Sequence, residues 1–186
     1  MCIPTCHFTS TPSWCGGARG SRPLSRIVPT EYDSLFRRQL LHGYVDDEDA
    51  ALLGGISGHA GLFGSANDVA QLAQAYAWGG RYGGQQLFDK NSLADYTRQQ
   101  FAGTGNRRGL AFDRPSSLPS GNTAPGASAG SFGHSGFTGT YFWVDPEKEL
   151  VVVVLTNRVN PSRRNNKLSE LNVRTQIQQV AIEAIR

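Results

Sequence analysis

The stretch Leu150–Leu155 constrains the fold more than any other, because it is apolar at every position. A strand with apolar side chains on both faces must be buried on both faces. It is preceded by the alternating segment TGTYFWVD, residues 138–145, and by the turn PEKE. The two segments therefore predict an antiparallel hairpin, and one layer of structure must cover each of its faces.

Amphipathic helices are predicted on both sides of this hairpin in the sequence. The last one carries an apolar stripe at helical spacing, made of Val173, Ile177, Val180, Ala181, Ala184 and Ile185. An earlier one is predicted in NDVAQLAQAYAWGG, with Ser65 or Asn67 as its cap and Gly79–Gly80 as its end. A third helix is predicted to follow Asp89. We expect the C-terminal helix to cover one face of the hairpin.

The segment before the first helix is rich in glycine. GGISGHAGLFGS, residues 54–65, has five glycines in twelve residues, which indicates close backbone approach or positive φ. We expect His59 to form a hydrogen bond within this segment, as a structural residue. The acidic run Asp46–Asp49 suits a turn or a helix N-terminus.

The region between the helices and the hairpin predicts a strand and a long loop. RRGLAFDRP predicts a strand that ends at Pro115. Residues 116–130 are small and polar, and predict a loop at the rim of a functional site.

Composition excludes several classes of protein. The formal net charge is +3, and the arginine pairs at 37–38, 107–108 and 163–164 are expected at the solvated surface, so no nucleic-acid partner is predicted. No apolar run approaches the roughly 20 residues that span a bilayer. We expect no metal and no cofactor, since neither Cys2, Cys6, His7 and Cys15 nor His42, Asp46, Asp47 and His59 has the spacing of a known site.

The sequence predicts two parts of unequal order. Residues 1–25 contain all three cysteines, lack helical or strand periodicity, and predict an unstructured leader. They also lack the basic start and the continuous apolar core of a secretory signal. Residues 26–186 predict a folded domain.

The tripeptide His134-Ser135-Gly136 stands directly before the hairpin. In acyl transfer, a serine attacks a carbonyl carbon and fixed N–H donors stabilise the developing oxyanion. A strand beside the nucleophile can supply such a donor and an edge for the substrate, and a glycine leaves room for the approach.

Together with GHAGLFGSANDVAQLAQAYAWGG, the hairpin and the terminal helix, this tripeptide resembles the serine β-lactamase and penicillin-binding protein superfamily. HGYVDDEDAALLGGISGHAGLFG and the segment that begins TNRVNPSRRNNK are similar to β-lactamase-related serine hydrolase domains fused to glycoside hydrolase family 3 β-N-acetylhexosaminidases. The resemblance covers residues 26–186 and implies an α/β (α+β) fold of three layers, α/β/α, with an antiparallel sheet. It implies that His134 and Ser135 face a small acyl substrate, that Gly136 permits its approach, and that the N–H of Phe137 is an oxyanion donor.

The sequence departs from this family in the two motifs that carry the nucleophile. Lys90, Lys148 and Lys167 are not preceded by serine at the spacing Ser-x-x-Lys, and no tyrosine forms Tyr-x-Asn. Ser65-Ala66-Asn67 fits Ser-x-Asn by letter, but we interpret it as a helix cap. Our hypothesis is that the chain is the C-terminal portion of a hydrolase whose N-terminal segment is missing through truncation or a shifted reading frame. The chain is then expected to be inactive.

Two alternatives stay open. One is an intact enzyme with an unconventional nucleophile: Ser57, Ser131 or Ser135. The other is a non-catalytic or split-enzyme module that a partner chain, such as the missing segment, completes. The substrate class (ester, D-amino-acid peptide or β-lactam) stays open as well. Without the N-terminal segment, we expect the surface of Val151–Val154 to lie open and the chain to self-associate.

Overall fold

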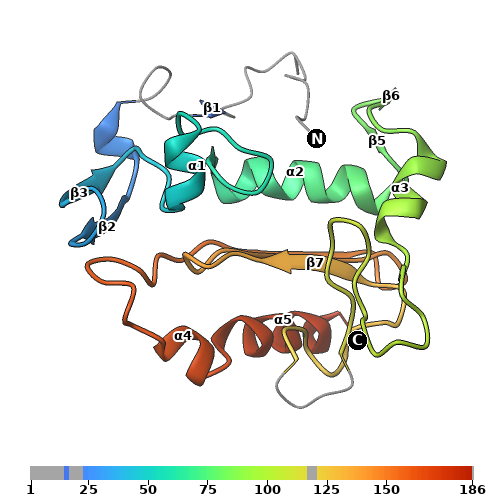
Figure 1. Ribbon diagram of the computed structural model, residues 1–186. Coiled ribbons are helices and arrows are strands. Elements are labelled where there is room, and N and C mark those ends of the chain that lie inside the picture. Colours follow the sequence, from blue (N-terminus) through green and yellow to red (C-terminus); the bar gives the residue numbers. More distant parts are fainter. Residues whose placement is uncertain (1–14, 17–22, 117–120, 186) are drawn as a thin grey trace.

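The computed structural model describes residues 15–16, 23–116 and 121–185. Its central element is an antiparallel sheet of β7 (Phe132–Ser135), β8 (Tyr141–Asp145) and β9 (Leu150–Val154), in the order β7-β8-β9. Figure 1 shows this sheet as a middle layer, with α2 (Ala66–Ala77) on one side and α4 (Lys167–Glu170) and α5 (Val173–Ala184) on the other. The predicted α/β/α arrangement with an antiparallel sheet is confirmed.

The hairpin of β8 and β9 has its predicted position, and Tyr141 pairs with Val154 while Asp145 pairs with Leu150. Side chains alternate between the two faces of these strands. On the α2 face, Phe132 and Val144 form a buried cluster with Ala73 of α2. On the α5 face, Tyr141 and Trp143 are almost fully buried, with their rings stacked.

The expectation of an open surface over Val151–Val154 is wrong. Val152 is 7% exposed and its neighbours in β9 are half-buried, because helices of this chain cover both faces of the sheet. Burial of one such side chain contributes about 1.5–3 kcal/mol. The expectation of self-association from this surface therefore loses its physical basis.

Helix α2 begins as the sequence predicts. The hydroxyl of Ser65 accepts from the N–H of Asp68, while the carboxylate of Asp68 accepts from the N–H of Ser65. This reciprocal pair is a capping box, which stabilises the first turn of a helix. Of the two predicted candidates, Ser65 and Asn67, Ser65 is therefore the cap. The cap predicted for α3 (Lys90–Thr97) is confirmed too, since Asp89 accepts from the N–H of Ser92.

The apolar stripe predicted for α5 does not face the sheet as a whole, and this prediction is wrong in part. Ile177 and Val180 are 41% and 64% exposed, whereas Gln178 and Ile182 are buried. The cause is the amide oxygen of Gln178, which accepts from the hydroxyl of Tyr141 and from the N–H of Ala124, each at 2.7 Å. Because these two buried donors need an acceptor, the polar side chain of Gln178 lies on the inner face of the helix.

The part of the chain before α2 forms smaller elements, which Figure 1 shows beside and above α2. They are the 3₁₀ helix η2 (Leu24–Arg26), the hairpin of β2 (Pro29–Asp33) and β3 (Gln39–His42), α1 (Glu48–Leu52) and the short strand β4 (Leu62–Phe63), which pairs with β1 (Cys15–Gly16). Helix α1 confirms the prediction for the acidic run, since Asp47 caps it. The β2–β3 hairpin was not predicted. Residues 1–14 and 17–22, with Cys2, Cys6 and His7, lie outside the described residues, and the leader over 1–25 stays a prediction.

The turn of the β2–β3 hairpin is closed by one buried carboxylate. Asp33 accepts from the backbone N–H groups of Leu35, Phe36 and Arg37 and from Nε of Arg37, at 2.8–3.0 Å. Burial alone raises the pKa of Asp33, but the side-chain and backbone hydrogen bonds from Arg37, Phe36 and Leu35 outweigh it and hold this pKa far below its ordinary value.

The glycine segment 54–65 has the backbone that its composition predicts. Gly61 has φ +100°, and a Cβ at this position would overlap the carbonyl oxygen of Gly55. His59 forms a hydrogen bond within the segment, with Ser57, as expected.

The strand predicted over RRGLAFDRP is wrong. Only Asp113 forms a bridge, with Gly133 of β7, and the preceding residues turn back through the hydrogen bond from Gly109 N–H to Phe112 O. β5 (Arg81–Tyr82) and β6 (Gln85–Gln86) form a short hairpin before α3.

The described part of the long loop, residues 121–130, packs against α5 and the hairpin rather than into solvent. Thr123 and Ala124 are buried and bind Gln178, and the N–H of Ser128 donates to Asp145. In the described parts of the chain, no helix has the length and apolar character that a bilayer crossing requires.

The arginine pairs are not uniformly solvated, which corrects the expectation. Arg37 donates to Asp33 and to the carbonyls of Val45 and Asp46. Arg107 donates to Arg114 O and Asn122, and Arg163 binds the buried carboxylate of Glu31. The first arginine of each pair therefore ties two segments together, while the second is exposed.

Candidate functional site

The predicted site residues lie at the end of β7, which is an edge strand of the three-stranded sheet. His134 pairs with Phe142 and Ser135 with Tyr141. His134 shares its strand face with the core residue Phe132, on the side of α2, and Ser135 alternates to the other face. His134, Ser135 and Gly136 are half-buried, while the side chain of Phe137 is 59% exposed.

The turn that follows β7 is held in one shape by its backbone. The N–H of Gly136 donates to Thr140 O at 2.8 Å, and the N–H of Gly139 donates to Gly136 O at 3.1 Å. A Cβ on Gly136 would overlap the hydroxyl of Thr140, so glycine is needed here for the turn itself. Gly139 has φ +114°, a conformation that residues with a side chain rarely adopt.

Residues after β9 clamp this turn from outside. The hydroxyl of Thr156 donates to Gly139 O at 2.7 Å. The backbone N–H of Arg158 donates to Thr138 O at 2.9 Å, and its Nε donates to Phe137 O at 2.7 Å. The consecutive carbonyl groups of the turn, at 137, 138 and 139, thus all accept hydrogen bonds from one short segment, residues 156–158.

Arg158 is itself anchored and covers the ring of Phe137. Its Nη1 donates to the carbonyls of Arg163 and Asn165 at 3.0 and 2.9 Å. Its guanidinium lies 4.2 Å from the ring centre of Phe137, in the range of a cation–π contact. The peptide of Phe137 is therefore oriented through both its carbonyl and its side chain. Among the described residues, nothing accepts a hydrogen bond from the N–H of Phe137.

A second arginine connects this turn to the N-terminal hairpin. The guanidinium of Arg163 lies 5.9 Å from the Phe137 ring and binds Glu31 of β2, with Asp46 at 3.7 Å. Glu31 is buried, and burial together with the charge of Glu31 raises the pKa of Asp46. The guanidinium of Arg163 contacts both carboxylates, and so links β2, the segment before α1 and the turn after β7.

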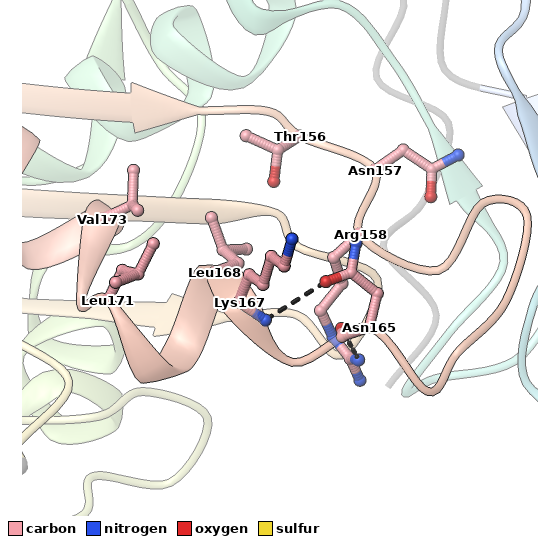
Figure 2. Close-up of a pocket in the computed structure, with 8 residues that line it drawn as sticks. All are labelled: Thr156, Asn157, Arg158, Asn165, Lys167, Leu168, Leu171 and Val173. Atoms are coloured by element: carbon pink, nitrogen blue, oxygen red, sulfur yellow. Dashed lines mark hydrogen bonds between the residues drawn. The ribbon is translucent and has the colours of Figure 1, made fainter.

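A shallow cavity of about 250 Å³ lies at the end of β9. Figure 2 shows its apolar wall, formed by Leu168, Leu171 and Val173, facing a polar side that includes Asn157, Arg158 and Asn165. The residues 134–137 do not line it. Arg158 is common to the cavity and to the turn, so the two are coupled through one side chain.

The three candidates for an unconventional nucleophile differ in their accessibility and in their place in the structure. Ser131 is fully buried, and its hydroxyl accepts from Nε1 of Trp143 and donates to Ser128 O. Such a hydroxyl supports the core and is not accessible to a substrate. Ser135 lies on the edge strand, and Ser57 lies in the glycine segment.

Ser57 belongs to a group that sequence analysis did not assemble. Its Oγ lies 2.7 Å from Nδ1 of His59, and Nε2 of His59 lies 2.9 Å from Oδ1 of Asp47. The spacing Ser-x-His was visible in the sequence, but the approach of Asp47 depends on how α1 folds back on the glycine segment. Within the ranges that the structure describes, no three His, Cys, Asp or Glu residues are grouped to hold a metal ion.

The family model described as Beta-lactamase matches residues 14–175. Two curated relatives, each named a putative D-alanyl-D-alanine carboxypeptidase, come from Salmonella gallinarum and Salmonella agona. They are 37% and 36% identical to this chain over 135 residues, which is 72% of the chain. The chain spans only 31% of the length of these relatives.

A solved structure is similar in fold. The crystal structure of a β-lactamase from Mycobacterium bovis superposes with a TM-score of 0.53 and 25% identity, covering 68% of this chain and 46% of that one. The family match over residues 14–175 includes the edge strand, the hairpin and α2. The chain belongs to the Beta-lactamase family.

Proposed function

We propose that this chain forms the substrate-side wall of an acyl-serine hydrolase and depends on a further polypeptide segment for its nucleophile. In this proposal, an acyl group lies along the free edge of β7, between His134 and Phe137. The N–H of Phe137 stabilises the oxyanion, and His134 and Ser135 bind the polar end of the substrate. Esters, D-amino-acid peptides and β-lactams are the substrate classes.

The observation that carries the proposal is the N–H of Phe137, which donates to no described residue and lies at the end of an edge strand whose turn is clamped. Oxyanion donors act best when they are oriented before the reaction, because no reorganisation is then needed in the transition state. The hydrogen bond from Gly139 N–H to Gly136 O orients the peptide plane that carries the Phe137 N–H, and the hydrogen bond from Arg158 to Phe137 O fixes the peptide that follows it. The names of the Salmonella relatives support a D-amino-acid peptide as the first substrate to test.

The nucleophile is the part that the sequence does not supply in the family's form. No Ser-x-x-Lys and no Tyr-x-Asn occur in the 186 residues. A lysine that activates the serine and a second group that completes the proton relay are needed for this type of acylation. We therefore propose that the chain alone is inactive by this Ser-x-x-Lys route. The link to family 3 β-N-acetylhexosaminidases is part of the same proposal.

A chimera tests the proposal directly. Residues 26–186 of this chain replace the matching part of the Salmonella gallinarum relative, which keeps the rest of its own sequence. Covalent labelling by a fluorescent penicillin and release of D-alanine from a D-Ala-D-Ala peptide are measured. We expect both activities in the chimera and neither in the 186-residue chain.

Variants of the chimera separate a wall residue from a merely structural one. Proline has no backbone N–H, so the substitution Phe137→Pro removes the proposed oxyanion donor. It should lower the rate of acylation by about 100-fold or more. Phe137→Ala keeps the N–H and is the matched control. If both variants acylate equally fast while melting like the parent, the N–H of Phe137 is not the donor and the proposal is wrong.

A split-enzyme module is the second candidate, favoured by the presence of helices on both faces of the sheet. A fragment that has its own hydrophobic core can stay folded until a second chain binds it. Mixing the 186-residue chain with the separately produced remainder of the relative should then restore penicillin labelling. Labelling in the fused chimera without labelling in the mixture would exclude this candidate.

A further inference from the structure

The hydrogen-bonded group of Ser57, His59 and Asp47 lies outside the wall formed by residues 134–137. Its three members come from two segments, since Asp47 caps α1 and the other two belong to the glycine segment. The chain of contacts runs from hydroxyl to imidazole to carboxylate at 2.7 and 2.9 Å. This is the order of groups that activates a serine by general base catalysis.

The carboxylate fixes which nitrogen of His59 carries the proton. The N–H of Ala50 donates to Oδ1 of Asp47 at 2.8 Å, so this oxygen is held in place by the cap of α1. This hydrogen bond, and then the one from His59, lower the pKa of Asp47, which keeps it an ionised acceptor. An ionised acceptor requires the proton on Nε2 of His59, and Nδ1 is then free to accept the proton of the Ser57 hydroxyl.

The group is open to a substrate. The side chains of His59 and Asp47 are 56% and 40% exposed. A Cβ built on Gly54, which is exposed, meets no atom of the described residues within 4 Å. Among the described residues, nothing accepts from the N–H of Gly58, which directly follows Ser57 and is a possible oxyanion donor. The neighbouring side chain of Ile56 is 59% exposed and offers an apolar contact for an acyl chain.

We propose that Ser57 is an acyl-accepting nucleophile for small activated esters, with His59 as its general base and Asp47 as the residue that positions His59. The oxygen of Ser57 forms a bond to the acyl carbon as its proton passes to Nδ1 of His59. The tetrahedral intermediate expels the alkoxide, which takes that proton and leaves as the alcohol. Water then attacks the acyl-serine by the same route and releases the acid.

This inference is independent of the proposed wall function, because it needs only residues of this chain. The test uses the 186-residue protein and an alkyl fluorophosphonate, which reacts with activated serines and releases fluoride. Intact mass and peptide mapping identify the modified residue. We expect one adduct, on Ser57, and its loss in Ser57→Ala.

His59→Gln removes the base and should slow the labelling by about 100-fold, as expected for a general base. Asp47→Asn keeps a residue that caps a helix well, and should slow the labelling less than His59→Gln does. Ser169→Ala is the control, since Ser169 is exposed and its hydroxyl binds no described residue. It should label at the parent rate.

Melting curves show whether each variant folds like the parent. The proposal is overturned if the adduct maps to another serine, if the parent labels no faster than Ser57→Ala, or if folded His59→Gln labels at the rate of Ser169→Ala. None of these results bears on the chimera, which reports on a serine from the relative.

Discussion

Replacement of Arg158 tests whether the turn after β7 is held by the segment after β9. The Arg158 guanidinium makes three hydrogen bonds to carbonyls, those of Phe137, Arg163 and Asn165, and lies over the ring of Phe137. A hydrogen bond contributes about 0.5–1.5 kcal/mol net, and an exposed cation–π contact about 0.5–1 kcal/mol. Because the group is partly exposed, we take the lower part of these ranges.

Arg158→Ala should therefore lower the free energy of unfolding by about 2 kcal/mol. For a chain of this length, that corresponds to a melting temperature lower by about 4–8 °C. Arg158→Lys keeps the charge but loses the planar donor geometry, and should recover less than half of the loss. Denaturant unfolding and thermal melts measure both quantities.

The local effect is more specific than the global one. The N–H of Gly139 donates within the turn, so its hydrogen exchange reports how often the turn opens. We expect exchange at Gly139 to be at least about 10-fold faster in Arg158→Ala under native conditions. Arg164→Ala is the matched control, because Arg164 is an exposed arginine of the same segment whose side chain forms no ion pair with the described residues. Equal stability and equal Gly139 exchange in the two variants would refute the clamp.

Three further predictions concern the scaffold. Gln178→Ala leaves the Tyr141 hydroxyl and a buried N–H without their acceptor and should destabilise the protein by about 2–4 kcal/mol in denaturant unfolding; a loss below 1 kcal/mol would contradict this role. Asp33 has a folded-state pKa far below that of the unfolded chain, so it stabilises the protein above about pH 4 and this contribution is lost as the pH falls further; Asp33→Asn should flatten the acid limb of stability against pH, and an unchanged limb would count against it. Gly61→Ala should cost more stability than Gly83→Ala, because both glycines have positive φ but only the first would collide with a backbone oxygen; similar melting temperatures would show that the glycine segment moves aside freely.

The sequence predicts those features that depend on local chemistry. The helix caps before α2 and α3, the hairpin that ends in Leu150–Val154 and the positive φ angles in the glycine segment 54–65 were all predicted, because each leaves a signature within a few residues. The apolar strand predicted that the sheet is covered on both faces, and the family resemblance implied the α/β/α order of the layers.

Two of the errors concern contacts between distant segments. The orientation of α5 is set by hydrogen bonds of Gln178 with Tyr141 and Ala124, which periodicity cannot register. The second face of the sheet is covered by α2, a helix that was predicted but not assigned to that face.

The same limit applies to the candidate site. The tripeptide His134-Ser135-Gly136 was identified by its place before the hairpin, and Phe137 by its place after the glycine. The clamp by Arg158 and the approach of Asp47 to His59 join residues that are 21 and 12 positions apart in sequence. A pattern of residue types carries no information about such pairs until the fold is known.

The clamp on the turn after β7 has a consequence for how new specificities could arise. Its hydrogen bonds to residues 137–139 end on carbonyl oxygens, which every amino acid possesses. Side chains at 137 and 138 can therefore be exchanged while those backbone hydrogen bonds persist. A library randomised at these two positions should yield mostly folded proteins, which makes this turn a practical starting point for directed evolution.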